Sequence, residues 1–104
     1  MLLTTTSTIQ NREIEIYYGL VSGETIIGAN IIKDFFAGIT DIVGGRSGSY
    51  ERVLKEAKEE AIREMSMQAS AMGANAVIGI DLDYETVGSS MLMVTAAVTA
   101  VKLK

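Results

Sequence analysis

The stretch from Gly73 to Glu85 constrains the fold most, because it ends a helix and begins a strand within a few residues. Gly73 follows a long helical pattern and is suited to the left-handed backbone conformation that ends many helices. After it, apolar and acidic residues alternate, as in a strand with two different faces. One face carries Ile80, Leu82 and Tyr84, and the other carries Asp81, Asp83 and Glu85.

The helix before Gly73 is predicted to run from about Ser49 to Met72. Its apolar residues recur at intervals of three and four, which is the spacing of one helix face. They are Leu54, Ala57, Ala61, Ile62, Met65, Ala69 and Met72. The other side of the helix is charged, so the pattern predicts a long amphipathic helix that packs by one face only.

The first part of the chain is predicted to be mostly extended. Residues 1–6 are rich in threonine and indicate a short strand or arm. Asn11 and Arg12 form a predicted turn, and alternation from Glu13 to Ile27 predicts a strand that is interrupted near Gly23. Residues 29–43 are predicted to contain a short helix that ends near Gly38.

Two strands, Asn75–Thr86 and Ser90–Leu103, are predicted to close the chain as a hairpin. A three-residue connection from Val87 to Ser89 would place Asp81 opposite Thr95 and Leu82 opposite Val94. This register keeps apolar residues together and leaves the acids beside Met93, Thr95 and Thr99. A slip by one residue would turn every side chain to the wrong face.

The last strand is apolar on both faces, and such a strand needs cover on both sides. The single long helix can cover only one face of the sheet. We therefore predict one α+β domain over residues 1–104, with an antiparallel or mixed sheet, one long amphipathic helix on one face, and copies of the chain covering the rest. A homo-oligomer follows as a hypothesis.

Composition excludes several kinds of chemistry. The chain has no Cys and no His, so it lacks thiolate and imidazole ligands, cysteine nucleophiles and histidine general bases. We therefore expect no enzymatic activity. Its net charge of −4, without a basic stripe, argues against nucleic acid as a partner. No signal peptide or membrane span is recognisable, so a soluble cytoplasmic protein is expected.

Asp81, Asp83 and Glu85 are the candidate metal ligands, because hard cations such as calcium or magnesium take oxygen ligands. Side chains two apart on a strand lie about 6–7 Å from each other, so neighbours can share one ion. The alternative is a solvated sheet face, or one whose acids meet Arg or Lys of an adjacent subunit.

The glycine-rich loop from Gly44 to Ser49 is a second candidate site. It places Arg46 and unpaired backbone amides at the start of the long helix, where a phosphate or carboxylate can bind. The candidate residues are Gly45, Arg46, Ser47 and Ser49. The alternative is a turn that needs glycine for its backbone angles, with Arg46 in a structural salt bridge.

Two long motifs resemble the YbjQ-like family of small prokaryotic proteins: Gly44–Glu51, and Gly73–Glu85 after the helix. Thr4-Thr5 and Gly28-Ala29-Asn30 are similar too, so the resemblance spans essentially the whole chain. It implies an α+β subunit, a ring-like homopentamer and heavy-metal binding. The expected function is cation binding at the junctions of a cytoplasmic homo-oligomer. The alternatives are a binder of anions or small metabolites through the Gly44–Ser49 loop, or a purely structural oligomer.

Overall fold

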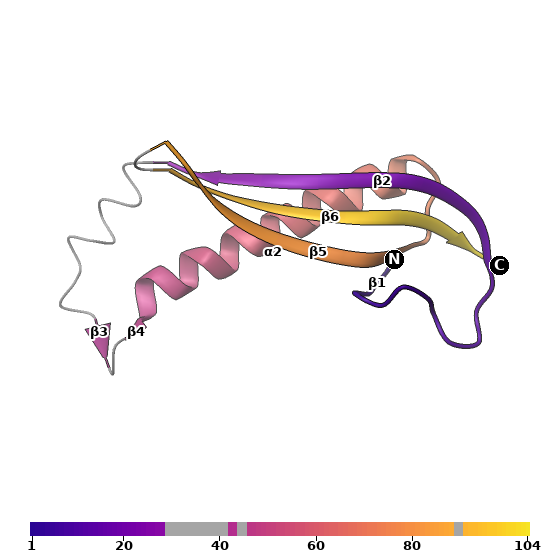
Figure 1. Cartoon of the computed structure of the whole chain (residues 1–104), viewed down its shortest axis with the longest axis horizontal. Coiled ribbons are helices and arrows are strands. Elements are labelled where there is room, and N and C mark those ends of the chain that lie inside the picture. The colour runs from indigo at the N-terminus through magenta and orange to yellow at the C-terminus, as the bar shows by residue number, and fades with distance from the viewer. Residues whose placement is uncertain (29–41, 44–45, 89–90) are drawn as a thin grey trace.

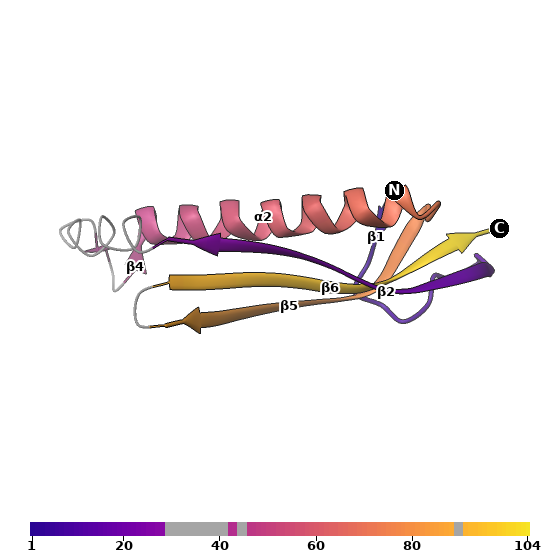
Figure 2. The same cartoon turned by 90° about the horizontal axis from the view of Figure 1, so that it is seen from above.

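The structure is a computed structural model that describes residues 1–28, 42–43, 46–88 and 91–104. Its elements in chain order are β1 (Leu2–Leu3), β2 (Ile14–Ile27), β3 (Ile42–Val43), β4 (Arg46–Ser47), α2 (Gly48–Ala71), β5 (Ala76–Val87) and β6 (Met91–Leu103). The long helix α2 lies along one face of the main sheet (Figure 1, Figure 2). The predicted α+β class with a long helix on one face is confirmed. The predicted short helix ending near Gly38 lies outside the described residues.

The main sheet has the strand order β1-β5-β6-β2. Strand β1 is parallel to β5, whereas β5 and β2 are both antiparallel to β6. The sheet is therefore mixed, and β6 occupies a central position between two long neighbours. Strands β3 and β4 form a separate two-stranded pair directly before α2.

The core lies between α2 and the sheet. The buried residues of α2 recur at intervals of four, and are Ala57, Ala61, Met65 and Ala69. They pack on a sheet face that includes Val21, Ile27, Val77, Val94, Ala96, Val98 and Ala100. Small alanine side chains let the helix approach the sheet closely, so the residues directly beneath it are buried. Met72, predicted as the last residue of the stripe, lies beyond the end of α2 and is exposed.

Helix α2 ends as the glycine predicts. Gly73 has a φ of 97°, its amide donates to the Ser70 carbonyl at 3.0 Å, and the Ala74 amide donates to the Ala69 carbonyl at 3.1 Å. These two bonds satisfy carbonyl groups that the helix would otherwise leave unpaired. The chain then turns directly into β5, which begins at Ala76.

Strand β2 is continuous across Gly23, so the predicted interruption there is wrong. A Cβ atom at position 23 would overlap the Ala61 carbonyl oxygen and the Met65 backbone nitrogen. Glycine is therefore required within the strand because the backbone of α2 comes so close. The irregularities of β2 lie earlier, where the pairing with β6 shifts between Ile14 and Ile16 and between Tyr17 and Gly19.

The predicted register of the final hairpin is also wrong, by two residues. Asp81 lies opposite Ala97, Leu82 opposite Ala96, and Asp83 opposite Thr95. The reason is that Val87 pairs with Met91 as part of the strand, so the connection begins later than predicted. A shift by two residues keeps each side chain on its predicted face, and the separation of acidic from apolar residues is preserved.

Among the described residues, the sheet face away from α2 is covered only near the chain termini. There Ala76, Ile78, Val101 and Leu103 are buried, and Ile9 of the N-terminal segment and Ile14 of β2 pack against them. The side chain of Asn75 fixes this end, since it accepts a hydrogen bond from the Leu103 amide at 2.6 Å and donates one to the Leu103 carbonyl at 3.1 Å. Beyond this region the same face is open.

Candidate functional site

The acidic row of Asp81, Asp83 and Glu85 lies on the open face of β5. All three residues are exposed, while Ile80 and Leu82 on the opposite face pack against the core. A register shift in β5 between Ile78 and Asp81, with Gly79 at a φ of 62°, precedes this row. The structure therefore places the three predicted site residues together along one strand.

The neighbours of the acidic row come from β6 and β2. Glu85 lies opposite Met93, and Asp83 lies opposite Thr95, so two of the three predicted neighbours are confirmed. Thr99 lies opposite Ile78 instead, because of the shift before Asp81. Thr95 in turn lies opposite Glu24 of β2. A fourth carboxylate therefore shares this face, about 10 Å across the sheet from β5.

Sequence reasoning missed Glu24 because Ser22 to Glu24 resembles a break between strands. Once β2 is continuous, Ser22, Glu24 and Ile26 alternate onto the face that carries the acidic row. The alternation itself was the available signal. The alternation is hard to recognise because it contains Gly23, which is required where the backbone of α2 comes close to the strand.

The acidic row has no basic partner in the part of the chain that the structure describes. The ion pairs there join Arg63 to Glu60, and Lys104 to Glu13 at 3.7 Å. Lys102 pairs in register with Ile16 and lies on the opposite sheet face. Among the described residues, no three or more acidic side chains converge on a point where they could hold a metal ion. One chain therefore supplies oxygen donors without enclosing an ion.

The rest of the open face is apolar in places. Leu20 is 80% exposed, Tyr17 65% and Ile26 57%, all from β2. Ser22 and Glu24 lie between Leu20 and Ile26 on this face, so the exposed apolar side chains do not form one continuous row. The open face thus combines an acidic row at β5 with separate exposed apolar side chains and one carboxylate at β2.

The Gly44–Ser49 loop can be followed only in part. Gly45 lies outside the described residues, and so do the side chains of Arg46, Ser47 and Ser49. The backbone of Arg46 and Ser47 forms β4, which leads directly into α2 at Gly48. The predicted position at the start of the long helix is therefore confirmed, while its anion binding stays a prediction.

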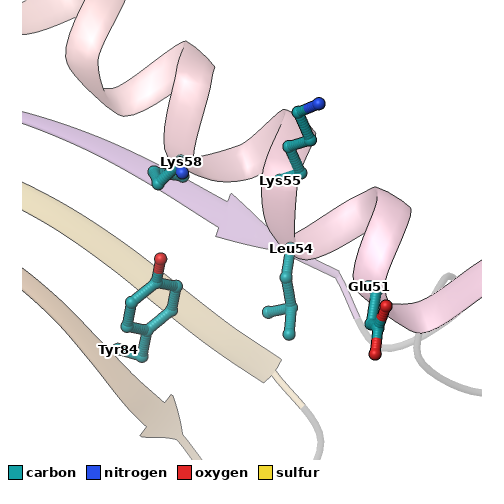
Figure 3. A pocket seen from close by; sticks show the side chains of 5 residues that line it. All are labelled: Glu51, Leu54, Lys55, Lys58 and Tyr84. Atoms are coloured by element: carbon teal, nitrogen blue, oxygen red, sulfur yellow. The ribbon is translucent and has the colours of Figure 1, made fainter. Parts of the chain in front are cut away.

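A cavity of about 410 Å³, open to solvent, lies between α2 and β5, and no sequence pattern predicted it. Leu54, Lys55, Lys58 and Glu51 line it from α2, and Tyr84 lines it from β5. Figure 3 shows the Tyr84 ring rising from β5 with its hydroxyl directed towards the helix. Sequence patterns could not reveal this cavity, because its walls come from two elements whose distance depends on the packing of α2.

These features define a class of small two-layer α+β proteins in which one long helix covers one face of a mixed sheet. The chain belongs to the YbjQ-like family, which is described as "Putative heavy-metal-binding" and matches residues 1–104. The family resemblance drawn from the two motifs is confirmed.

Relatives match along the whole chain. A UPF0145 protein of Anoxybacillus flavithermus is 59% identical over 104 residues, covering 100% of this chain and 99% of its own. UPF0145 proteins of Geobacillus kaustophilus and Geobacillus thermodenitrificans are 58% and 57% identical, and the matches cover 99% and 100% of those proteins.

A crystal structure of a DUF74 family protein from Pediococcus pentosaceus has the same fold. Its TM-score is 0.61 at 14% sequence identity, with 100% of this chain and 98% of that chain covered. No helix among the described residues is both long and apolar enough to cross a membrane.

Proposed function

We propose that this protein is a cytoplasmic, ring-forming homo-oligomer that acts by binding rather than catalysis, and that it holds a hard divalent cation at its subunit junctions. The acidic row of Asp81, Asp83 and Glu85 supplies the ligands. The observation that carries this proposal is the position of the row, on an exposed strand without basic partners among the described residues.

The donor atoms decide which metal fits. Soft heavy metals favour thiolate and imidazole, and this chain has no Cys and no His. Carboxylate oxygens suit Ca²⁺ or Mg²⁺. The acidic row therefore fits a hard cation, and the chain lacks the thiolate and imidazole ligands that soft heavy metals favour.

The exposed residues of the open face support the proposed assembly. Leu20 and Ile26 would be sheltered by a second copy, and the acidic row would gain the further ligands that one chain lacks. Calcium takes six to eight oxygen ligands, which is more than three adjacent carboxylates on one strand present in a suitable geometry. A junction between copies meets both requirements.

Calorimetric titration with CaCl₂ and with MgCl₂ tests the cation. We expect saturable binding by the wild-type protein and none by the double variant Asp81→Asn/Asp83→Asn. The control variant Glu13→Gln/Glu59→Gln removes the same charge from exposed positions elsewhere and should bind as the wild type does. Equal titration curves for all three proteins would contradict the proposal.

The backbone geometry at β4 favours a second candidate function. Because β4 runs directly into α2, the amide end of the helix begins directly after Arg46 and Ser47, where an anionic metabolite could bind. A thermal-shift screen of anionic metabolites on wild type and Arg46→Ala tests this, and a shift that depends on Arg46 would support it. A protein that binds neither ion but still assembles would be a structural oligomer.

A further inference from the structure

Helix α2 lies off-centre on the sheet. It packs mainly on β2, less on β6 and least on β5. Tyr84, on the helix-facing side of β5, is consequently 48% exposed. The cavity beside it, shown in Figure 3, lies in this uncovered strip above β5.

The two sides of α2 carry opposite charges. Lys55 and Lys58, here called the basic flank, line the cavity above β5. The acidic flank, on the side of β2, consists of Glu56, Glu60 and Glu64. Glu56 and Glu60 line a second cavity of about 290 Å³ together with Thr25 to Ile27, and the Glu64 carboxylate accepts a 3.4 Å hydrogen bond from the Glu24 amide.

Each flank also holds one opposite charge. Arg63 pairs with Glu60 on the acidic side, and the hydrogen bond from Arg63 lowers the pKa of Glu60. Glu51 lines the cavity of the basic flank. With Glu60 balanced by Arg63, Glu56 and Glu64 leave the acidic flank with a net negative charge. On the basic flank, the two lysines outnumber the single carboxylate of Glu51. The flanks remain complementary.

The sheet edges below these flanks are open as well. Among the described strands, β2 pairs only with β6, so its outer edge is unpaired. The outer edge of β5 is bonded to the N-terminal segment only as far as Ile80, through bonds with Thr4 and Thr6. From Asp81 to Val87 no described strand covers it. Open edges of this kind present rows of backbone donors and acceptors to another strand.

We propose that copies of this chain associate head to tail, with the β2 edge and acidic flank of one copy against the β5 edge and basic flank of the next. This inference rests on the homo-oligomer proposed above and assigns the contact between its sheet edges, which is separate from the cover of the open face. Because α2 lies over β2, the glutamates of one copy would overhang the uncovered strip of its neighbour. Three strands of about 4.8 Å each would set neighbouring helices about 14 Å apart. That gap is wider than direct helix packing at about 8–10 Å, and long Lys and Glu side chains can bridge it.

The contact is heterologous, since two different surfaces meet, and such contacts close into rings or continue as fibres. It would also bring the partner subunit's Glu24 beside the acidic row, because Glu24 and Asp83 lie on the same sheet face. The cation site would then receive a carboxylate from the second copy.

Charge reversal tests the interface. Lys55→Glu/Lys58→Glu makes both flanks acidic, and Glu56→Lys/Glu64→Lys makes both basic. Like charges placed opposite each other weaken association strongly, so we expect each double variant to raise the dissociation constant about a hundred-fold. Sedimentation velocity over a range of concentrations measures this, and circular dichroism reports whether each variant folds.

Rescue makes the test specific. Mixing the two double variants should restore association, because the acidic flanks of one variant then meet the basic flanks of the other. A ring with an odd number of copies, such as a pentamer, would keep one contact between like charges. The fourfold variant, with all four charges exchanged, should assemble by itself as the wild type does. It also keeps the test valid if one double variant does not fold.

Arg52→Glu/Lys102→Glu is the matched control, since it changes net charge equally at exposed positions that line neither cavity. It should assemble normally. A wild-type protein that stays monomeric would overturn both the oligomer and the interface. An oligomer that neither charge reversal weakens would overturn the proposed interface but not the oligomer. Cation binding is measured separately, by the calorimetric titration.

Discussion

The two faces of the main sheet show how differently one strand can be used. Directly beneath α2, side chains are small or buried, and position 23 is a glycine because the backbone of the helix leaves no room for a side chain there. On the other face of the same strand, Leu20 and Ile26 are exposed beside Glu24. The chain itself covers most of the face beneath α2, whereas the described residues leave much of the other face exposed.

The largest expected effect is a difference in stability between substitutions at two adjacent residues of β2, whose positions face opposite sides of the sheet. Gly23→Ala places a methyl group against the backbone of α2 at Ala61 and Met65, which cannot shift cheaply. We expect a loss of about 3 kcal/mol in the free energy of unfolding. Ser22→Ala, on the open face, should change it by less than about 0.5 kcal/mol. Urea denaturation at one fixed protein concentration measures both, and equal effects would remove the distinction between the faces.

The covered face was largely predictable from the sequence, because it depends on local patterns. The three-and-four spacing predicts α2, Gly73 predicts its end, and alternation after Ile80 predicts which residues of β5 face the core. These predictions succeed because each depends only on the spacing of residues within one helix or strand.

The remaining features depend on distances between segments that are far apart in sequence. In the sequence, Gly23 resembles a break in the strand, and only the close approach of α2 explains the glycine. The position of Glu24 on the open face could not be predicted for the same reason. The hairpin register depended on whether Val87 joins the strand, which local patterns leave open. The cavity at Tyr84 follows from the off-centre position of α2.

A smaller effect tests what covers the open face. Leu20→Ser removes an apolar side chain that is 80% exposed in one chain, so the fold of the subunit should be unaffected. If a second copy buries Leu20, the substitution should weaken assembly by about 2 kcal/mol per contact. Light scattering across a dilution series measures this. Arg12→Ser, an exposed change near the covered end, is the control. Unchanged assembly in Leu20→Ser would show that copies do not cover this part of the face.

The smallest effect concerns the exposed pair of Glu60 and Arg63 on α2. The hydrogen bond from Arg63 lowers the pKa of Glu60 below its usual value of 4.5. A carboxyl whose pKa is lower in the folded state stabilises the fold above its unfolded pKa, and this contribution is lost as pH falls through the folded value. Arg63→Ala should therefore return the pKa of Glu60 towards 4.5, which NMR titration of its carboxyl carbon detects, while Arg52→Ala should leave it low. Because the pair is exposed, stability at neutral pH should hardly change in a single subunit. A clear loss of stability that grows with protein concentration would instead show that this flank of α2 is covered by a neighbouring copy.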